Sequence, residues 1–260
     1  METPISAASE IAIGSLRESA PIAFDLAARF KDAGFRLALV GGPVRDLLLQ
    51  RLGNDLDFTT NARPEDTKRI LRGWADDIWD VGIKFGTIAA RKNETTIEIT
   101  TYRSESYDAE SRNPEVQFGN TIEGDLRRRD FTINAMAIEL TTSEVKFIDL
   151  FGGVTDLLKR VIRTPESPEI SFSDDPLRML RAARFAAQLN FTINPDVIEA
   201  MTTMKDRLEI ISMERVRDEF IKILMSNNPR VGITILVDTG LCDLFLPEVP
   251  QLRLEIDEHH

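Results

Sequence analysis

The sequence predicts an α+β domain, built as a mixed sheet with helices, over residues 1–150, followed by an all-α domain over residues 151–260. Two patterns predict this arrangement. Before residue 150, short apolar or alternating runs typical of strands lie between helical patterns. After Gly152-Gly153, apolar residues recur at helical spacing in one segment after another. A chain of 260 residues is long enough for two such domains.

The composition is that of an ordinary globular protein, with 42% hydrophobic and 29% charged residues. The single cysteine, Cys242, excludes an internal disulfide and fits a reducing cytosol, so we expect a cytoplasmic protein. Residues 1–20 contain three glutamates and no apolar core, and therefore do not predict a secretory signal. Because no apolar run approaches the length of a membrane span, we expect no membrane partner. The sequence carries no signal for the oligomeric state.

Charge and histidine content narrow the classes of function. The net charge of −11 argues against non-specific nucleic-acid binding by the whole surface, although Arg127-Arg128-Arg129 forms a local basic patch. Histidine acid–base catalysis in the body of the chain is excluded, because the only histidines are His259 and His260.

Hydrophobic spacing and turn residues predict the elements of the first domain in order. Residues 21–33 predict a helix that ends before Gly34. A strand over residues 37–40 leads into Gly41-Gly42 and a helix that begins at Pro43. The following elements are a strand that carries Asp55 and Asp57, a helix over 63–74, a strand over 78–81, a hairpin of 87–91 and 95–101, a polar loop over 103–118 and a strand over 145–150.

The second domain is predicted from helical patterns alone. The segment over 174–189 is the strongest, with acidic residues at its start and arginines further along, as the helix dipole favours. The other predicted helices cover residues 155–160, a segment that begins at Asn194-Pro195, residues 213–225 and residues 231–238.

Residues 37–60 predict a site for a metal-bound triphosphate. Asp55 and Asp57 are two apart on a strand, so they project from one face and repel each other unless a cation lies between them. Mg²⁺ prefers a few carboxylate oxygens and completes its coordination with water and substrate phosphates. The Gly41-Gly42 turn lets backbone N–H groups approach an anion, and Arg45 in the following helix can pair with phosphate.

Each part of this site has a simpler alternative when it is taken alone. A Gly-Gly pair between a strand and a helix is as often only a tight turn, and an Asp-x-Asp pair is more often a solvated strand face. Their order within one short stretch favours the phosphate site. The sequence has no GxGxxG after a strand and no GxxxxGK[ST], which excludes two other phosphate-binding loops.

The second arm of the hairpin offers a third carboxylate. Alternation along this strand places Glu98 on the face opposite to Ile97 and Ile99. If the strand is the sheet neighbour of the Asp55–Asp57 strand, Glu98 lies beside both aspartates. The alternative is a solvent-exposed glutamate without a catalytic role.

A second constellation lies in the helix predicted over 174–189. Asp175 and Arg178 are three apart and share a face, which Arg181 and Arg184 continue. A fixed acceptor beside a donor complements the Watson–Crick edges of adenine and cytosine, whereas guanine and uracil present the reverse order. The alternative is an ordinary salt bridge on an exposed helix.

Four segments in this order resemble the class II tRNA nucleotidyltransferase and bacterial poly(A) polymerase family: GGPVRDLLLQRLGNDLDF, RRRDFTINAMA, DLFGGVTDLLKRVIRT and DDPLRMLRAARF. MERVRDEFIKIL is similar to a fifth. The resemblance spans roughly residues 35–225, and within the family it is greatest to the CCA-adding members. It implies a head with the polymerase-β-like nucleotidyltransferase fold and a helical neck and body.

The resemblance also implies the roles of individual residues. Asp55 and Asp57 would hold catalytic Mg²⁺, Glu98 would help to deprotonate the RNA 3′-hydroxyl, and Gly42 and Arg45 would contact the triphosphate. The other nucleotide-binding residues would be Arg129, the base-reading pair Asp175 and Arg178, and the supporting arginines Arg181 and Arg184. One departure is visible, because the family usually has Glu-Asp where this chain has Asp174-Asp175.

The activity implied by the resemblance is addition of CMP and AMP, from CTP and ATP, to the 3′ end of tRNA without a nucleic-acid template. A poly(A) polymerase shares every segment quoted and stays an alternative, as does an enzyme that adds only CC or only A. A non-catalytic nucleotide- or RNA-binding module and a small-molecule nucleotidyltransferase are weaker alternatives. The absence of a GxGxxG motif after a strand disfavours an NAD-binding enzyme. Because the segment Leu252–His260 ends where relatives often continue into a further helical body, some with a His-Asp hydrolase domain, we expect the chain to be cut short at this end.

Overall fold

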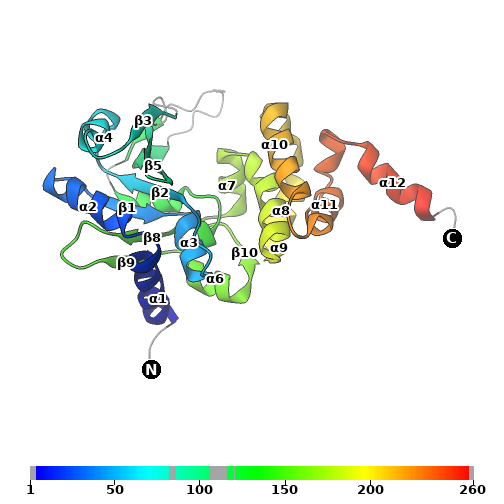
Figure 1. Ribbon diagram of the computed structural model, residues 1–260. Coiled ribbons are helices and arrows are strands. Elements are labelled where there is room, and N and C mark those ends of the chain that lie inside the picture. The colour runs from blue at the N-terminus through cyan, green and yellow to red at the C-terminus, as the bar shows by residue number, and fades with distance from the viewer. Residues whose placement is uncertain (1–3, 82–85, 106–115, 120, 258–260) are drawn as a thin grey trace. The chain divides into compact units, whose positions relative to one another are not determined.

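The computed structural model describes residues 4–81, 86–105, 116–119 and 121–257 and divides into two compact units, Met1–Leu157 and Leu158–His260 (Figure 1). The predicted fold class is confirmed: a mixed sheet with helices precedes a helical part. The domain boundary predicted at residue 150 lies shortly before this division. Among the described helices, none is both long and apolar enough to cross a membrane.

The first unit is built on a seven-stranded sheet with the strand order β3-β4-β5-β2-β1-β8-β9. The strands are β1 (Leu37–Val40), β2 (Asp55–Thr60), β3 (Asp77–Asp80), β4 (Thr87–Lys92), β5 (Thr95–Thr101), β8 (Met136–Glu139) and β9 (Lys146–Asp149). Only β2 and β5 pair in parallel; the other neighbours in this sheet are antiparallel. The predicted hairpin is confirmed, with Asn93 at its turn in the left-handed region (φ 54°).

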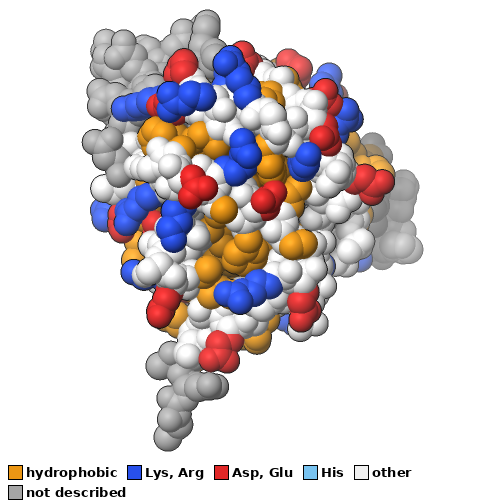
Figure 2. Space-filling view, turned by 60° about the vertical axis from the view of Figure 1, so that its left-hand side comes forward, with side chains coloured by type: hydrophobic (Ala, Val, Ile, Leu, Met, Phe, Trp, Pro, Cys, Tyr) orange, Lys and Arg blue, Asp and Glu red, His pale blue; other side chains and the backbone are white. Residues whose placement is uncertain are grey.

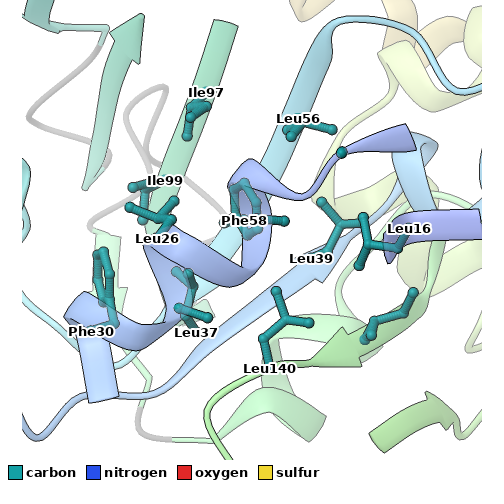
Figure 3. Packing of buried hydrophobic residues seen from close by; sticks show 14 of the residues in the cluster. Leu16, Leu26, Phe30, Leu37, Leu39, Leu56, Phe58, Ile97, Ile99 and Leu140 are labelled. Atoms are coloured by element: carbon teal, nitrogen blue, oxygen red, sulfur yellow. The ribbon is translucent and has the colours of Figure 1, made fainter. Parts of the chain in front are cut away.

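One face of the sheet carries the main core of this unit. Leu39, Phe58 and Ile97 point into a cluster that four helices cover (Figure 3). These helices are α1 (Pro4–Ser19), α2 (Ile22–Asp32), α3 (Gly42–Leu48) and α4 (Pro64–Leu71). The sequence analysis assigned no element to α1, although Ala12 and Leu16 are fully buried in the cluster. The helix predicted over 63–74 ends earlier, at Leu71.

The opposite face is covered at one end only by the short helix α5 (Ile122–Arg127). Leu126 packs there with Tyr102 of the chain and with Val40 and Ala137 of strands β1 and β8. Towards β2 and β5 the carboxylate residues Asp55, Asp57 and Glu98 on this face are exposed, while Thr96 and Thr100 are half-buried and Thr59 is buried. The face therefore changes from a packed layer to a solvated surface within one sheet.

The prediction of a polar loop over 103–118 is wrong for the first three and the last three residues of this range. Strands β6 (Arg103–Glu105) and β7 (Val116–Phe118) pair there as an antiparallel ribbon. Sequence-local patterns do not reveal this pairing, because its partners are separated by a polar segment. Residues 106–115, the middle of the predicted loop, lie outside the described part of the chain.

Helices dominate the second unit. They are α7 (Pro168–Asp174), α8 (Leu177–Leu189), α9 (Pro195–Thr203), α10 (Met213–Leu224), α11 (Pro229–Asp238) and α12 (Glu248–Asp257), with short 3-10 turns at Lys205–Ile210 and Cys242–Leu244. Two two-residue strands, β10 (Val161–Ile162) and β11 (Thr192–Ile193), pair in parallel. α10 and α11 both pack against α8. A Cβ on Gly232 of α11 would lie only 2.6 Å from Ile223 Cγ2 of α10, so these two helices are also in close contact there.

The helix predicted over 174–189 is confirmed over Leu177–Leu189, but it begins three residues later than predicted. The chain leaves helix α7 at Asp175, which has extended backbone angles (φ −145°, ψ 101°), and α8 begins only after Pro176. The proline ring disfavours the helical conformation of the residue before it, which explains the break. Asp175 therefore precedes α8 instead of sharing a helical face with Arg178.

Helix α6 (Gly153–Lys159) depends on a close approach of its first residue to the sheet. The carboxylate of Asp149, at the end of β9, accepts hydrogen bonds from the N–H groups of Gly153 (2.7 Å) and Val154 (2.9 Å). A Cβ on Gly153 would overlap the carbonyl oxygen of Thr132 and lie 2.8 Å from Met136 Cγ. Only glycine permits this contact.

We expect Gly153→Ala to destabilise the first unit by about 1–3 kcal/mol, because the added methyl group has no space. Gly14→Ala in α1 is the matched control: nothing lies within 4 Å of its Cβ position, so the variant should be neutral or more stable by about 0.5–1 kcal/mol. Urea denaturation followed by circular dichroism measures both. Equal stability of the two variants would show that the Gly153 contact is not tight.

Candidate active site

The turn between β1 and α3 is shaped by glycine. Gly41 has φ 74°, a conformation that other residues rarely adopt, and the Nη1 atom of Arg129 lies 2.8 Å from the position of a Cβ there. At Gly42 a Cβ would make only an ordinary contact, 3.5 Å from Arg45 Nη2. The sequence prediction named Gly42, but Gly41 is the position where the structure requires glycine.

The parallel pairing of β2 and β5 brings the three predicted carboxylates to one face. Asp57 lies directly opposite Glu98, and Asp55 lies opposite Thr96. All three carboxylate residues are exposed, whereas Leu56 alternates with them and is buried. The expected placement of Glu98 beside the aspartates is confirmed, while its catalytic role stays a prediction.

Asp57 is the carboxylate most affected by its surroundings. The surrounding protein removes part of the water around its carboxylate, although the residue stays partly accessible to solvent. This desolvation raises the pKa of Asp57 from 3.8 to about 6. The negative charges of Glu98 and Asp55 also raise the pKa, and Arg129 lowers it. The positive charge of Arg129 therefore offsets only part of the effect of desolvation and of the two neighbouring carboxylates on the pKa of Asp57.

Arg129 is held over the glycine turn by a buried carboxylate. Asp125 of α5 is fully buried and accepts hydrogen bonds from Arg128 Nη2 (2.7 Å) and Arg129 Nη2 (3.1 Å). Burial by itself raises the pKa of Asp125, but the two guanidinium groups outweigh it and hold the pKa below its usual range. Arg129 is thereby fixed between the Gly41 turn and Asp57, although its role in nucleotide binding stays a prediction.

Arg45, predicted to contact the triphosphate, is engaged in a buried network. Its guanidinium donates to both carboxylate oxygens of Asp46 (2.9 and 3.1 Å) and to Asn134 Oδ1 (2.6 Å). Asn134 in turn donates to Asp130 Oδ1 (3.1 Å). Arg45 therefore connects α3 to the 3-10 turn Thr132–Asn134, and any phosphate contact would come in addition to this role.

The carboxylate face fits a divalent cation that is shared with a substrate. Among residues 4–81, 86–105, 116–119 and 121–257, no three acidic, histidine or cysteine side chains are arranged to hold a metal ion by themselves. Asp55 and Asp57 project from one face, and their charges already disfavour each other. Mg²⁺ sites typically use one or two carboxylates and take the remaining ligands from water and phosphate. The donor set suits that arrangement and does not suit a closed structural metal site.

In the second unit, Asp175 and Arg178 are both fixed by the break between α7 and α8. Asp175 Oδ1 accepts the N–H of Leu177 (3.1 Å), and its Oδ2 accepts from Arg215 Nη2 (3.0 Å). Arg178 is buried and donates to the backbone oxygen (3.2 Å) and hydroxyl (3.0 Å) of Ser171 in α7. Both side chains are thus held in defined positions, but by turn contacts instead of a shared helical face.

Arg181 and Arg184 have different surroundings. The Arg184 guanidinium is buried, lies 3.0 Å from both carboxylate oxygens of Glu219 in α10, and is 4.5 Å from the Phe185 ring centroid. Arg181 is partly exposed, with its guanidinium 5.5 Å from the same ring. Arg184 therefore stabilises the packing of α8 against α10, and only a supporting role in nucleotide binding stays predicted for both.

Asp125 and Asn134 were not predicted from the sequence as parts of the site. A signal existed for Asp125, because it stands three and four residues before Arg128 and Arg129 on one helix, the spacing of helical ion pairs. The spacing gives no comparable signal for Asn134, which meets Arg45 across 89 residues of sequence.

Comparisons with known proteins identify relatives for most of the chain. Residues 37–163 match the family described as "Poly A polymerase head domain", and residues 190–252 match "Probable RNA and SrmB-binding site of polymerase A". The chain is 41% identical over 231 residues to a CCA-adding enzyme of Streptococcus gordonii, a match that covers 88% of this chain and 56% of the relative.

Two solved structures extend the comparison. The Bacillus stearothermophilus CCA-adding enzyme in complex with CTP is 34% identical with a TM-score of 0.78, covering 92% of this chain and 57% of that one. The Thermotoga maritima CCA-adding enzyme complexed with tRNA-CCA is 30% identical with a TM-score of 0.71, covering 86% and 51%. The chain thus spans about half the length of the relatives that it matches.

We expect Asp125→Asn to destabilise the first unit by about 2–4 kcal/mol at pH 7, because it leaves two arginines without their buried partner. Since the pKa of Asp125 is lower in the folded than in the unfolded chain, its stabilising contribution is present above about pH 4 and is lost as the pH falls further. Urea denaturation at several pH values should show the gap between wild type and variant closing on acidification. A gap that is independent of pH would contradict the assigned ion pairs.

Proposed function

The chain belongs to the family of the poly(A) polymerase head domain, and we propose that it carries the active site of an enzyme that adds CMP and AMP, from CTP and ATP, to the 3′ end of tRNA. The observation that carries this proposal is the face on which Asp55, Asp57 and Glu98 meet beside Arg129 and the Gly41 turn. A carboxylate cluster next to a fixed arginine suits a cation-bound triphosphate. The CTP and tRNA complexes of the similar CCA-adding enzymes support the choice of substrates.

In this proposal, Asp55 and Asp57 bind Mg²⁺ together with the phosphates of the incoming nucleotide. Bound Mg²⁺ would lower the pKa of the RNA 3′-hydroxyl and balance the negative charge of the triphosphate and of the departing pyrophosphate. Glu98, opposite Asp57, is placed to accept the proton of the 3′-hydroxyl. Arg129, held by Asp125 at the Gly41 turn, offers its remaining donors to the nucleotide.

The reaction needs no covalent intermediate with the protein. The 3′-oxygen of the RNA attacks the α-phosphorus of CTP or ATP, the bond between the α-phosphorus and the bridging oxygen breaks, and pyrophosphate leaves. Positioning of the two substrates and neutralisation of charge supply most of the rate in phosphoryl transfer. The sheet register and the Asp125–Arg129 pair are the features of this chain that provide positioning.

Base selection is assigned to Asp175 and Arg178. The Asp175 carboxylate can accept from the amino group of cytosine or adenine, while Arg178 donates to the adjacent ring nitrogen. Both side chains are fixed by contacts to Leu177, Arg215 and Ser171, so their order of acceptor and donor does not vary. Guanine and uracil present the opposite order and are rejected.

Incorporation of each labelled nucleotide onto tRNA that ends before, within and after CCA tests the proposal. Ordered addition of C, C and A that then stops supports a CCA-adding enzyme, and long A tails support a poly(A) polymerase. Addition of only CC or only A identifies a partial enzyme. No incorporation onto any RNA, by a chain that still binds nucleotide, would replace the proposal with a non-catalytic binding module.

We expect the affinity for a divalent cation to fall about tenfold per pH unit below pH 6, because Asp57 must lose its proton to bind the cation and its pKa is about 6. Mn²⁺, which also prefers carboxylate oxygens, makes the binding measurable by electron paramagnetic resonance. Asp57→Asn is the control and should bind weakly without this pH dependence. Wild-type affinity that is constant between pH 5 and 7 would remove Asp57 from the cation site.

We expect Asp175→Asn to reduce the preference for CTP and ATP over UTP and GTP by about tenfold, since one lost hydrogen bond to the base is worth about 1–3 kcal/mol. Asparagine retains an oxygen that can accept the N–H of Leu177, so the turn should persist. Unchanged discrimination among the four nucleotides in Asp175→Asn would refute the base-reading role.

A further inference from the structure

A row of side chains crosses the carboxylate face of the sheet from Asp57 to the sheet edge. Asp57 of β2 lies opposite Glu98 of β5, Glu98 lies opposite Ala89 of β4, and Ala89 lies opposite Trp79 of β3. Residues directly opposite each other in neighbouring strands point to the same face. Trp79 is therefore on the carboxylate face, two strands away from Glu98.

Trp79 is an unusual residue for this position. It lies on the edge strand of the sheet and is 41% exposed, whereas its neighbour Ile78 packs against the core on the other face. Ala89, which separates it from Glu98, is small and buried. The indole thus forms the outer end of a row whose other end is the proposed site of reaction.

Charged side chains of both signs lie near the indole. Trp79 lines a shallow hollow at the sheet edge with Asp80 of β3 and with Lys68 and Arg72, which belong to the helix α4 region on the core side of the sheet. The acidic residues of β3 are balanced by cations, since Asp80 pairs with Lys68 (2.6 Å) and Asp77 pairs with Arg91. On the face shown in Figure 2, Lys and Arg side chains are likewise interspersed with acidic and apolar ones. Aromatic side chains beside scattered cations are typical of surfaces that bind single-stranded RNA.

We propose that Trp79 stacks on a base of the RNA strand whose 3′ end reacts beside Glu98, and that Arg72, around the edge of the sheet, contacts a phosphate of this strand. The inference rests on the proposed function, which supplies the RNA 3′ end. Two strand spacings separate Glu98 from Trp79, or about 10 Å. This is roughly the length of three nucleotides stacked at about 3.4 Å, so the base in contact lies two or three nucleotides before the 3′ end.

Intrinsic fluorescence tests the stacking directly, because the chain contains only two tryptophans. Trp74 is buried and donates its indole N–H to Asp25 (2.7 Å), so RNA that stacks on Trp79 should quench the exposed indole selectively. The probe is a single-stranded RNA pentamer with a free 3′-hydroxyl, titrated without divalent metal or nucleotide. We expect saturable quenching in the wild-type chain and none in Trp79→Phe, which retains Trp74.

Affinity for the same RNA, labelled and followed by fluorescence anisotropy, separates stacking from quenching. Trp79→Ala should raise the Kd about tenfold, as loss of one base stack does, while Trp79→Phe should restore most of the affinity. Val81→Ala is the matched control, because Val81 is 44% exposed near the same edge but is not an aromatic platform. It should bind as the wild type does.

Unquenched Trp79, wild-type affinity in Trp79→Ala, or equal quenching by CTP alone would overturn the inference. The proposed function would survive that result if the wild-type chain still adds CMP and AMP to tRNA. Conversely, quenching and affinity loss as expected, in a chain that incorporates no nucleotide onto any RNA, would support the stacking site and refute the proposed function. The two claims can therefore fail separately.

Discussion

The parallel pairing of β2 with β5, in a sheet whose other pairs are antiparallel, is the constraint on which the site depends. It sets Asp57 opposite Glu98 and leaves the intervening apolar residues to the helix-covered core. Side-chain direction repeats every two residues, so a slip of one residue in this register would bury a carboxylate and expose part of the core. The burial of Leu56, Phe58 and Ile97 therefore fixes the register that the chemistry requires.

The same arrangement creates an excess of negative charge that the rest of the head balances. Desolvation, together with the negative charges of Glu98 and Asp55, raises the pKa of Asp57, and without a bound cation this carboxylate opposes folding at neutral pH. Arg129 is the cation of this chain that offsets the charge, and Asp125 fixes it while fully buried. Glycine at position 41 then permits the guanidinium to approach the turn. Charge therefore determines which groups meet in the site, and the buried carboxylate of Asp125 holds Arg129 in its position there.

Local patterns in the sequence were sufficient for much of this account. Strand alternation predicted that Asp55 and Asp57 share a face and that Glu98 points to the other face of its strand from Ile97 and Ile99. The structure confirms both predictions. The parallel pairing itself was only a condition of the prediction, because strand order depends on packing between distant segments. Arg45 illustrates the same limit, since its partner Asn134 lies far along the chain.

The predicted start of the helix over 174–189 was wrong for a different reason. Its apolar periodicity is real, but Pro176 restricts the residue before it and separates α7 from α8. The consequence is chemical as well as structural, because Asp175 is fixed by a turn and by Arg215 instead of by helical spacing. Local backbone chemistry therefore outweighed periodicity at a predicted functional residue.

The most direct test of the central claim is a crystal structure of the chain with Mn²⁺ and a non-hydrolysable CTP analogue, with anomalous scattering used to locate the metal. Our account predicts Mn²⁺ density within coordination distance of the Asp55 and Asp57 carboxylates, bridging to the triphosphate beside Arg129. Ordered nucleotide elsewhere on the chain, or metal bound to the triphosphate without either aspartate, would contradict it.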